Sequence, residues 1–351
     1  MDRSRHRASS AILIGAFALS SCSGAGGPVS LPSSMSPALA QHVGVAKSAR
    51  VFYVVNAPYN HAPDGYVTVY SNDKLLRKLK PAALPEFEHS LGVDRAGKLY
   101  VASEKSEAVI VYAPLGGRIS RTITQGIDDP LAMQLSDAGA LYVANFRGNN
   151  VTVYAAGSNK VSRTISKDVG QPQGLALGLG QLFVFSSSVG GSKVNVYAAG
   201  TKGPDKVLRT ISNGVSGPLA IAFDDGNLYV ANSNNTVTVY AKGMPTLTRT
   251  ISQGIEQPKA LAFDRFHNLF VLNARGNSVT IYAKGMEALT GTIANVISPG
   301  GIALAADGTL YVSSRAPSGG VGAYKTTATG GTLIQTVTNG MSYPSTLAVG
   351  P

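Results

Sequence analysis

One segment recurs along most of the chain. Its clearest copy is LYVANSNNTVTVYAKGMPTLTRTI, at residues 228–251, and its most regular mark is the tyrosine that closes the inner segment VTVY. This tyrosine recurs as Tyr70, Tyr112, Tyr154, Tyr197, Tyr240, Tyr282 and Tyr324, with spacings of 42, 42, 43, 43, 42 and 42 residues. Periods of roughly 40–50 residues are typical of β-propellers, in which each copy forms one blade. Seven copies therefore predict an all-β fold, a seven-bladed β-propeller of four-stranded antiparallel blades.

Each copy contains four short segments in which apolar and polar residues alternate. In the fifth copy these segments, named a to d, are LAIAF (219–223), LYVAN (228–232), TVTVY (236–240) and LTRTI (247–251). Alternation with a period of two predicts antiparallel strands joined by turns. The b–c and d–a connections then share one face of the propeller, here named the loop face, and the a–b and c–d connections share the other, the turn face.

Segment a usually begins at a proline, and large and small residues alternate after it. After Pro218, for example, Ile221 and Phe223 are large, whereas Ala220 and Ala222 are small. Strand geometry places these two sets on opposite faces of a blade. We therefore expect the bulky face of one blade to pack against the flat face of the next, so that both are buried.

The order of the segments predicts how the ring closes. The first copy begins with segment b, VFYVVN at residues 51–56, and the last copy ends with segment a, STLAVG at residues 345–350. If the C-terminal strand completes the first blade, neither end of the chain leaves an open sheet edge at the ring closure.

The N-terminus has the pattern of an export signal. Three arginines, Arg3, Arg5 and Arg7, precede an apolar segment, AILIGAFAL at residues 11–19, which is too short to span a bilayer. The next residues, LSSC, resemble the lipobox of bacterial lipoproteins, which implies cleavage after residue 21 and lipidation of Cys22. The alternative is an ordinary secretory signal with an incidental cysteine. Cys22 is the only cysteine of the chain, so an intrachain disulfide is excluded.

A segment rich in Gly, Ser, Pro and Ala follows the predicted signal. Such a composition buries too little apolar surface to fold by itself, so residues 22–50 are expected to form a lipid-anchored flexible linker before a propeller domain at 51–351. The expected location is the bacterial cell envelope, at the outer membrane or the cell surface. The expected state is a monomer held to the membrane through its N-terminal lipid.

The charge of the chain is basic. The net charge is +11, and about +9 remains without residues 1–21, which hold three arginines and one aspartate. An exported basic protein meets anionic lipid headgroups and polysaccharides. Runs of Lys and Arg interleaved with aromatic residues are missing from the sequence, so nucleic acid is not an expected partner.

The b–c connections are rich in Asn, Ser, Gly and Arg, as in NFRGNN (145–150), NSNN (232–235) and NARGNS (273–278). These side chains could hydrogen-bond to a protein or polysaccharide of the envelope, but the same residues also form tight turns. The candidate binding residues are Asn145, Arg147, Asn149, Asn232, Asn234, Asn235, Arg275 and Asn277.

Two repeat patterns also resemble known families over residues 51–351. LYVAN followed by VTVY resembles the YVTN family of surface β-propellers, and the a–b pattern with LAxDxxGNLYVAN resembles NHL repeats. The resemblance implies the propeller fold. These families include protein-binding, glycan-binding and enzymatic members, so it implies no single function.

An enzymatic role is the alternative to a non-catalytic binding or scaffold module. Lactonases that resemble the gluconolactonase group need Glu, Asn and Asp on the inner strands, which here present mostly Ala, Gly and aliphatic residues, with Gln134 as the one polar exception. For a lyase-like site at the channel mouth, the best general base is His89, beside Glu86 and Glu88, with His61 as a partner. We favour the non-catalytic interpretation, with no metal, no cofactor and no catalytic residue.

Overall fold

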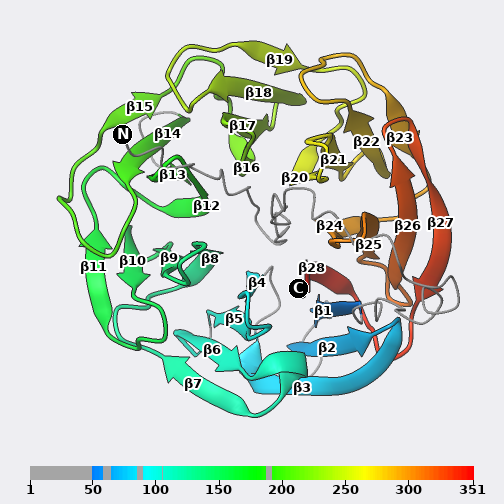
Figure 1. Cartoon of the computed structure of the whole chain (residues 1–351), viewed down its shortest axis with the longest axis horizontal. Coiled ribbons are helices and arrows are strands. Elements are labelled where there is room, and N and C mark those ends of the chain that lie inside the picture. The colour runs from blue at the N-terminus through cyan, green and yellow to red at the C-terminus, as the bar shows by residue number, and fades with distance from the viewer. Residues whose placement is uncertain (1–49, 58–64, 85–89, 105, 187–191) are drawn as a thin grey trace, which may run out of the picture.

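The computed structural model of the protein describes residues 50–57, 65–84, 90–104, 106–186 and 192–351. Within these ranges the chain forms seven four-stranded antiparallel sheets, which surround a central axis as the blades of a propeller (Figure 1). The predicted fold class is therefore confirmed. The described helical structure is a single 3-10 turn, η2 (Pro114–Gly116). Over the same ranges, no helical segment has the length and hydropathy that crossing a bilayer requires.

The strands of blades 1 to 4 follow, each from the axis outward. Blade 1 consists of β28 (Pro344–Val349), β1 (Val51–Asn56), β2 (Gly65–Ser71) and β3 (Lys74–Leu84). Blade 2 consists of β4 (Leu91–Val93), β5 (Leu99–Ser103), β6 (Ala108–Tyr112) and β7 (Ile119–Ile123). Blade 3 consists of β8 (Pro130–Leu135), β9 (Leu141–Asn145), β10 (Asn150–Tyr154) and β11 (Val161–Ile165). Blade 4 consists of β12 (Pro172–Gly178), β13 (Gln181–Ser186), β14 (Lys193–Ala198) and β15 (Arg209–Ile211).

Blades 5 to 7 have the same order. Blade 5 consists of β16 (Pro218–Asp224), β17 (Asn227–Asn232), β18 (Thr236–Ala241) and β19 (Arg249–Ile251). Blade 6 consists of β20 (Pro258–Phe263), β21 (Leu269–Asn273), β22 (Ser278–Tyr282) and β23 (Gly291–Ile293). Blade 7 consists of β24 (Pro299–Leu304), β25 (Thr309–Ser314), β26 (Val321–Thr327) and β27 (Gly330–Val337).

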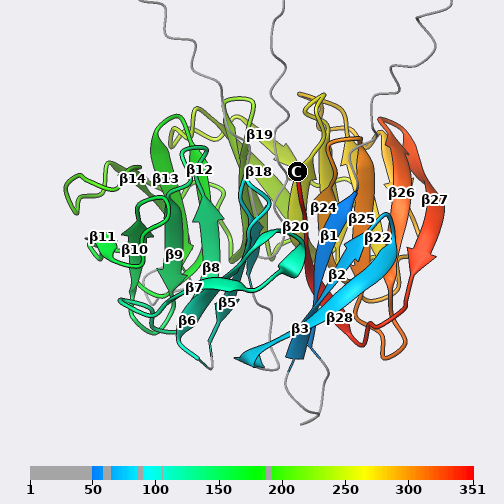
Figure 2. The same cartoon turned by 60° about the horizontal axis from the view of Figure 1, so that its bottom comes forward.

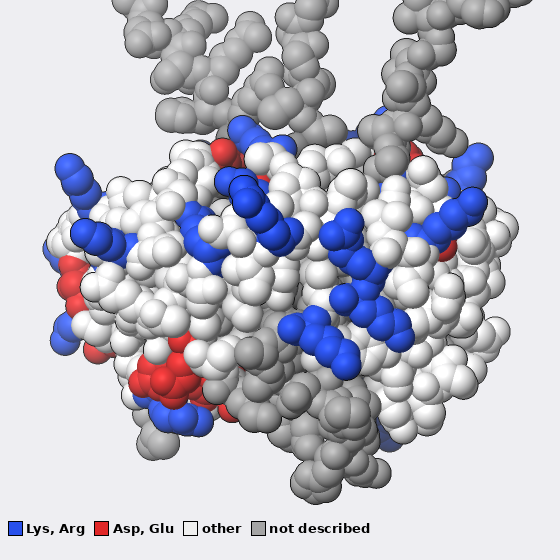
Figure 3. Space-filling model, turned by 90° about the horizontal axis from the view of Figure 1, so that it is seen from below, with Lys and Arg blue, Asp and Glu red and all other residues white. Residues whose placement is uncertain are grey.

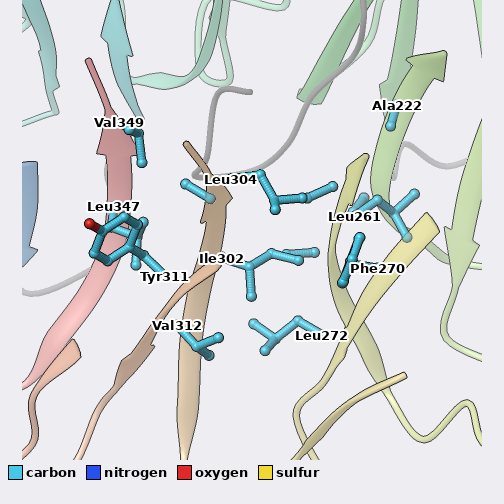
Figure 4. Packing of buried hydrophobic residues seen from close by; sticks show 14 of the residues in the cluster. Ala222, Leu261, Phe270, Leu272, Ile302, Leu304, Tyr311, Val312, Leu347 and Val349 are labelled. Atoms are coloured by element: carbon cyan, nitrogen blue, oxygen red, sulfur yellow. The ribbon is translucent and has the colours of Figure 1, made fainter. Parts of the chain in front are cut away.

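The blades pack with a bulky face against a flat one, as the alternation predicts. Phe223 of blade 5 lies over Gly178 of blade 4 so closely that a Cβ atom on this glycine would overlap the phenyl ring. The same ring stacks on Phe183 of blade 4, with 5.4 Å between the ring centroids. Figure 4 shows the continuation of this core from Ala222 in blade 5 to Leu347 in blade 1. Aromatic and aliphatic side chains thus fill the spaces between blades.

The ring closes through the C-terminal strand. In blade 1, β28 pairs antiparallel with β1, and the register places Phe52 opposite Val349 and Val54 opposite Leu347. Beyond the strand, the backbone N–H of Gly350 donates to the carbonyl of Val51 at 2.8 Å. Both ends of the described chain therefore lie in one blade, and the predicted closure is confirmed (Figure 1).

Arginines of the outer strands tie neighbouring blades together. Arg163 in blade 3 donates to two carbonyls of blade 4. One is that of Ala198, the last residue of β14, at 2.7 Å, and the other is that of Pro204 in the following c–d connection, at 2.8 Å. Arg209 in blade 4 donates to the carbonyl of Gly243 at 2.7 Å in the c–d connection of blade 5. Part of the positive charge of the chain is therefore structural.

The two faces of the propeller are distinct in Figure 2, where the loop face is below and the turn face above. Strand β1 begins at the turn face, because β1 is the b strand of blade 1 and its last residue, Asn56, precedes the b–c connection. Residues 1–49 therefore join the propeller, through Arg50, at the turn face.

Candidate functional site

A buried polar network holds the connections of the loop face. In blade 5, the side-chain amide of Asn232 donates to the hydroxyl of Thr238 at 3.1 Å, and its side-chain carbonyl accepts from the backbone N–H of Ser216 at 2.9 Å. The hydroxyl of Tyr240 donates to the carbonyl of Asn213 at 2.6 Å. Ser216 and Asn213 both belong to the d–a connection that leads into blade 5, so three side chains of one blade fix the path of the chain between blades.

The same network recurs in four blades. In each of these blades Asn ends the b strand, and the c strand has Thr two residues before its Tyr. The four sets are Asn56–Thr68–Tyr70, Asn145–Thr152–Tyr154, Asn232–Thr238–Tyr240 and Asn273–Thr280–Tyr282. In all four, the tyrosine hydroxyl donates to a carbonyl of the d–a connection at 2.6–2.7 Å. Burial raises the pKa of these tyrosines, to about 12 for Tyr70. These four tyrosines are thus structural, because their hydroxyls hold the d–a connections.

Two of the candidate binding residues belong to this network. Asn145 and Asn232 have no exposed surface. The side-chain amide of Asn145 donates to Asn150 at 2.8 Å and to Thr152 at 3.0 Å, and its carbonyl accepts from the backbone of Asp128 at 3.1 Å. Because neither side chain reaches the surface, we assign both a structural role and leave them out of the binding surface.

The other asparagines are exposed and shape the turns. Asn149, Asn235 and Asn277 take the left-handed backbone conformation, with φ of 53°, 62° and 46°, which asparagine tolerates better than most residues. The side-chain carbonyl of Asn235 accepts from the backbone of Gln257 at 2.7 Å in the connection to the next blade. Asn234, at the tip of the same turn, is also exposed and accepts from Thr236 at 2.7 Å. Hydrogen bonds thus hold these turns, which present a polar surface.

The two arginines, Arg147 and Arg275, are exposed at equivalent places of blades 3 and 6. The guanidinium of Arg147 lies 3.8 Å from the carboxylate of Asp129, and its side chain remains 66% exposed. Burial and the nearby Asp129 raise the pKa of Glu104, while Arg147 lowers it, so the three groups form one charged cluster where blades 2 and 3 meet. In Figure 3 acidic side chains gather at the lower left, on this part of the loop face. Sequence reasoning missed both acids, because they precede or follow strands of different blades.

The inner strands carry a repeated irregularity next to the loop face. In blades 3 to 6 a β-bulge follows the first proline of the a strand, and the extra residue is Leu131, Gln173, Leu219 or Lys259. Each of these is half-buried between two buried neighbours. Bulges re-aim a side chain, and here they do so on the strands nearest the axis (Figure 1). Two leucines, an amide and an ammonium group do not form the set of oxygen ligands that a hard cation prefers.

A described histidine, His267, and the glutamine noted in the sequence, Gln134, lie away from the loop-face turns. His267 is in the a–b turn of blade 6 on the turn face, where its Nδ1 is 2.9 Å from a carboxylate oxygen of the buried Asp224 in blade 5. Gln134 is buried in β8, and its side-chain amide donates to the carbonyl of Leu135 at 3.3 Å. Among the described residues, no three His, Cys, Asp or Glu side chains are placed to hold a metal ion. His61, Glu86, Glu88, His89 and the lipidation candidate Cys22 lie outside the described residues.

The sequence matches no family model and no curated protein. Solved structures with the same fold include proteins provisionally named 6-phosphogluconolactonase. One from Bacteroides fragilis is 15% identical, with a TM-score of 0.65 over 87% of this chain and 99% of that one. Another from Bacteroides uniformis is 14% identical, with a TM-score of 0.64 over 86% and 99%. The WD40 propeller domain of Doa1 is 12% identical, with a TM-score of 0.59 over 76% and 86%. These identities show the fold alone.

Proposed function

We propose that the protein is a lipid-anchored, extracytoplasmic β-propeller that binds a protein or glycan of the cell envelope through its loop face. The observation that carries this proposal is the placement of Arg147 and Arg275, both exposed on turns that buried networks hold in place. Rigid turns lose little conformational entropy when a partner binds, so their polar groups contribute more fully to affinity. The resemblance to YVTN and NHL repeats is consistent with such a role.

The spacing of the arginines favours a large partner. Blades 3 and 6 lie on nearly opposite sides of the ring (Figure 1), so a single small pocket would not hold both side chains. A partner that covers the face would meet Arg147, the exposed asparagines and Arg275 together. Guanidinium and amide groups match the carboxylates and hydroxyls of acidic polysaccharides as well as the carbonyls of a protein surface.

The binding surface is tested by affinity capture from an envelope extract with the full chain as bait. Arg147→Ala combined with Arg275→Ala is expected to weaken capture of the identified partner, because both guanidinium contacts are lost. The matched control is Lys202→Ala combined with Lys206→Ala, which removes two exposed cations from the turn face and should leave capture unchanged. Equal capture by both double variants would place the binding surface elsewhere.

The lipid anchor is a separate part of the proposal. It is supported by the charged and apolar segments before LSSC and by the single cysteine of the chain. Acyl chains contribute about 0.8 kcal/mol per buried methylene, so two or more chains hold a protein at a membrane without a spanning helix. In a bacterial host, Cys22→Ala is expected to lose acylation, as measured by incorporation of labelled fatty acid. Undiminished incorporation into this variant would show that Cys22 is not the modified residue.

A lactonase-like hydrolase with a site at the channel mouth is the second hypothesis. The named neighbours share only the fold, and the bulge residues of blades 3 to 6 supply one cation, one amide and two leucines. Nothing in the described inner strands therefore favours hydrolysis over binding. Turnover of a sugar lactone by the purified chain, lost in Lys259→Ala and Gln173→Ala, would favour the hydrolase instead.

A further inference from the structure

Large apolar side chains are exposed at the tips of the turn face. Five of them occupy the tips of a–b or c–d turns, with exposed fractions of 42–61%: Leu115, Leu179, Met244, Phe266 and Met286. Leu208, 48% exposed, also lies in a c–d connection, directly before β15. Among the described loop-face connections, only Ile297 is a large apolar side chain exposed to a similar degree, at 67%. Contact of Phe and Met side chains with water is less favourable than their burial. Their concentration at the turn tips of one face therefore indicates that another surface covers them.

Cations flank these apolar tips. Exposed basic residues of the same turns are Arg118, Lys242, Arg265 and Lys284, of which Lys284 pairs with Asp225, and Lys160 is exposed in the c–d turn of blade 3. The guanidinium of Arg265 lies over the ring of Phe266, 4.7 Å from its centroid. Apolar tips between cations are the combination that suits the interface of an anionic bilayer, where the tips enter the acyl boundary and the cations meet headgroups.

The acids of this face are largely engaged by neighbours. Asp225 is 2.6 Å from the ammonium of Lys284, and Asp137 is 2.8 Å from the guanidinium of Arg95. Asp264 accepts from the backbone N–H groups of its own turn. Glu287, next to Met286, is exposed and opposes contact with anionic lipid at that tip. The apolar side chains of this face therefore indicate contact with a membrane more strongly than its net charge does.

The chain itself leads to the same face. Arg50 precedes β1 at the turn face, so residues 1–49 join the body there, and Cys22 is 28 positions before Arg50. A body joined by so short a segment to a lipid at Cys22 has a high effective concentration at the bilayer, which makes weak surface contacts effective.

We propose that the turn face docks on the bilayer surface, with Phe266, Met244 and Met286 as the inserted tips and anionic phospholipid headgroups as the ligand of the flanking cations. The inference rests on the proposed lipid anchor and adds an orientation to it. With the turn face against the membrane, the loop face points away from it toward the partner.

The test attaches a polarity-sensitive fluorophore to single introduced cysteines in the full chain. Phe266→Cys and Met286→Cys report on the turn face, and Ile297→Cys is the matched control on the loop face, because all three side chains are exposed. Each labelled chain is mixed with vesicles of phosphatidylglycerol and phosphatidylcholine that carry a quencher at the acyl boundary. We expect blue-shifted and quenched emission at positions 266 and 286, unchanged emission at 297, and a smaller response with phosphatidylcholine alone.

Equal, water-like emission from all three positions would overturn the proposal. A blue shift at positions 266 and 286 with native membranes, but not with pure lipid vesicles, would also overturn the proposal, because the covering surface would then be a protein. Failure of the anchor gives a different result: the fluorophore would label Cys22 in the otherwise unchanged chain, and that chain would remain in the aqueous fraction. Vesicles added to this unanchored chain still report whether positions 266 and 286 contact lipid.

Discussion

The closing strand offers the most direct test of how the ring is held together. Leu347 lies in β28, has no exposed surface and packs in the core shared by blades 7 and 1, near Tyr311 and Val349 (Figure 4). Opposite β28, the ring of Phe52 in β1 stacks on Tyr70 at 4.6 Å and on Tyr311 at 4.7 Å. A cavity at position 347 would therefore open inside an aromatic cluster that joins two blades.

The expected cost of Leu347→Ala is about 2–5 kcal/mol, the range for buried leucines whose surroundings relax only in part. Typical domains are stable by about 5–15 kcal/mol, so this single change removes a large share. With a urea slope of about 3 kcal/mol per M, a loss of about 3 kcal/mol lowers the unfolding midpoint by about 1 M. The chain has 15 tyrosines and no tryptophan, so tyrosine fluorescence reports unfolding.

The matched control is Leu333→Ala in β27, where the side chain is 52% exposed. This change should alter stability by no more than about 0.5 kcal/mol. A chain that ends at residue 343 should lose more than Leu347→Ala, because β1 then also keeps an unpaired edge. If Leu347→Ala shifts the midpoint no more than Leu333→Ala does, β28 does not hold the ring closed and the argument fails.

Three further predictions follow from the networks and the packing. Asn232→Ala should cost roughly 1–3 kcal/mol because the backbone N–H of Ser216 loses its acceptor and the hydroxyl of Thr238 loses a donor, whereas Asn234→Ala should be within about 0.5 kcal/mol in the same urea assay. Gly178→Ala should cost about 1–3 kcal/mol because its Cβ overlaps a phenyl ring, while Gly330→Ala, which has nothing within 4 Å, should be nearly neutral in thermal unfolding. Burial raises the pKa of Tyr70 from 10.0 to about 12, so the native state favours the neutral phenol. The contribution of this phenol to the free energy of unfolding should be complete below pH 10 and fall as the pH rises toward 12. Urea midpoints measured at several pH values should show this contribution in the unchanged chain and not in Tyr70→Phe. Midpoints that do not differ between each variant and its control, or that do not change with pH, would contradict these expectations.

The fold could be predicted from the sequence because its signals are local and repeated. The tyrosine spacing counts the blades, and the alternating segments place the strands: VFYVVN was expected at 51–56 and forms β1 (Val51–Asn56). The closure followed from the order of the segments alone. The bulges of the a strands could not be predicted, because they depend on how the strands approach the axis rather than on the residue that bulges.

The role of the asparagines could have been found in the sequence. Blades whose b strand ends in Asn have Thr at the third position of the paired c-strand stretch, as in Thr152 and Thr238, whereas blades whose b strand ends in Ser have Ile110, Asn195 or Gly322 there. This pairing across copies indicates a contact within the blade. Composition alone suggested a binding surface instead, because Asn is common in turns and in polar interfaces alike.

The pairing of the first strand with the last also determines when the protein can finish folding. Phe52 and Val349 are opposite each other in one blade, although 297 positions separate them in the chain. At synthesis rates of about 5–20 residues per second, roughly 15–60 s pass between the appearance of the two strands. Blades 2 to 7 are each built from one contiguous segment of the chain and can pair their strands early, but the ring stays open until β28 emerges. The ring can therefore close only after β28 has emerged from the ribosome, and under the export that we propose this late step would follow passage across the membrane.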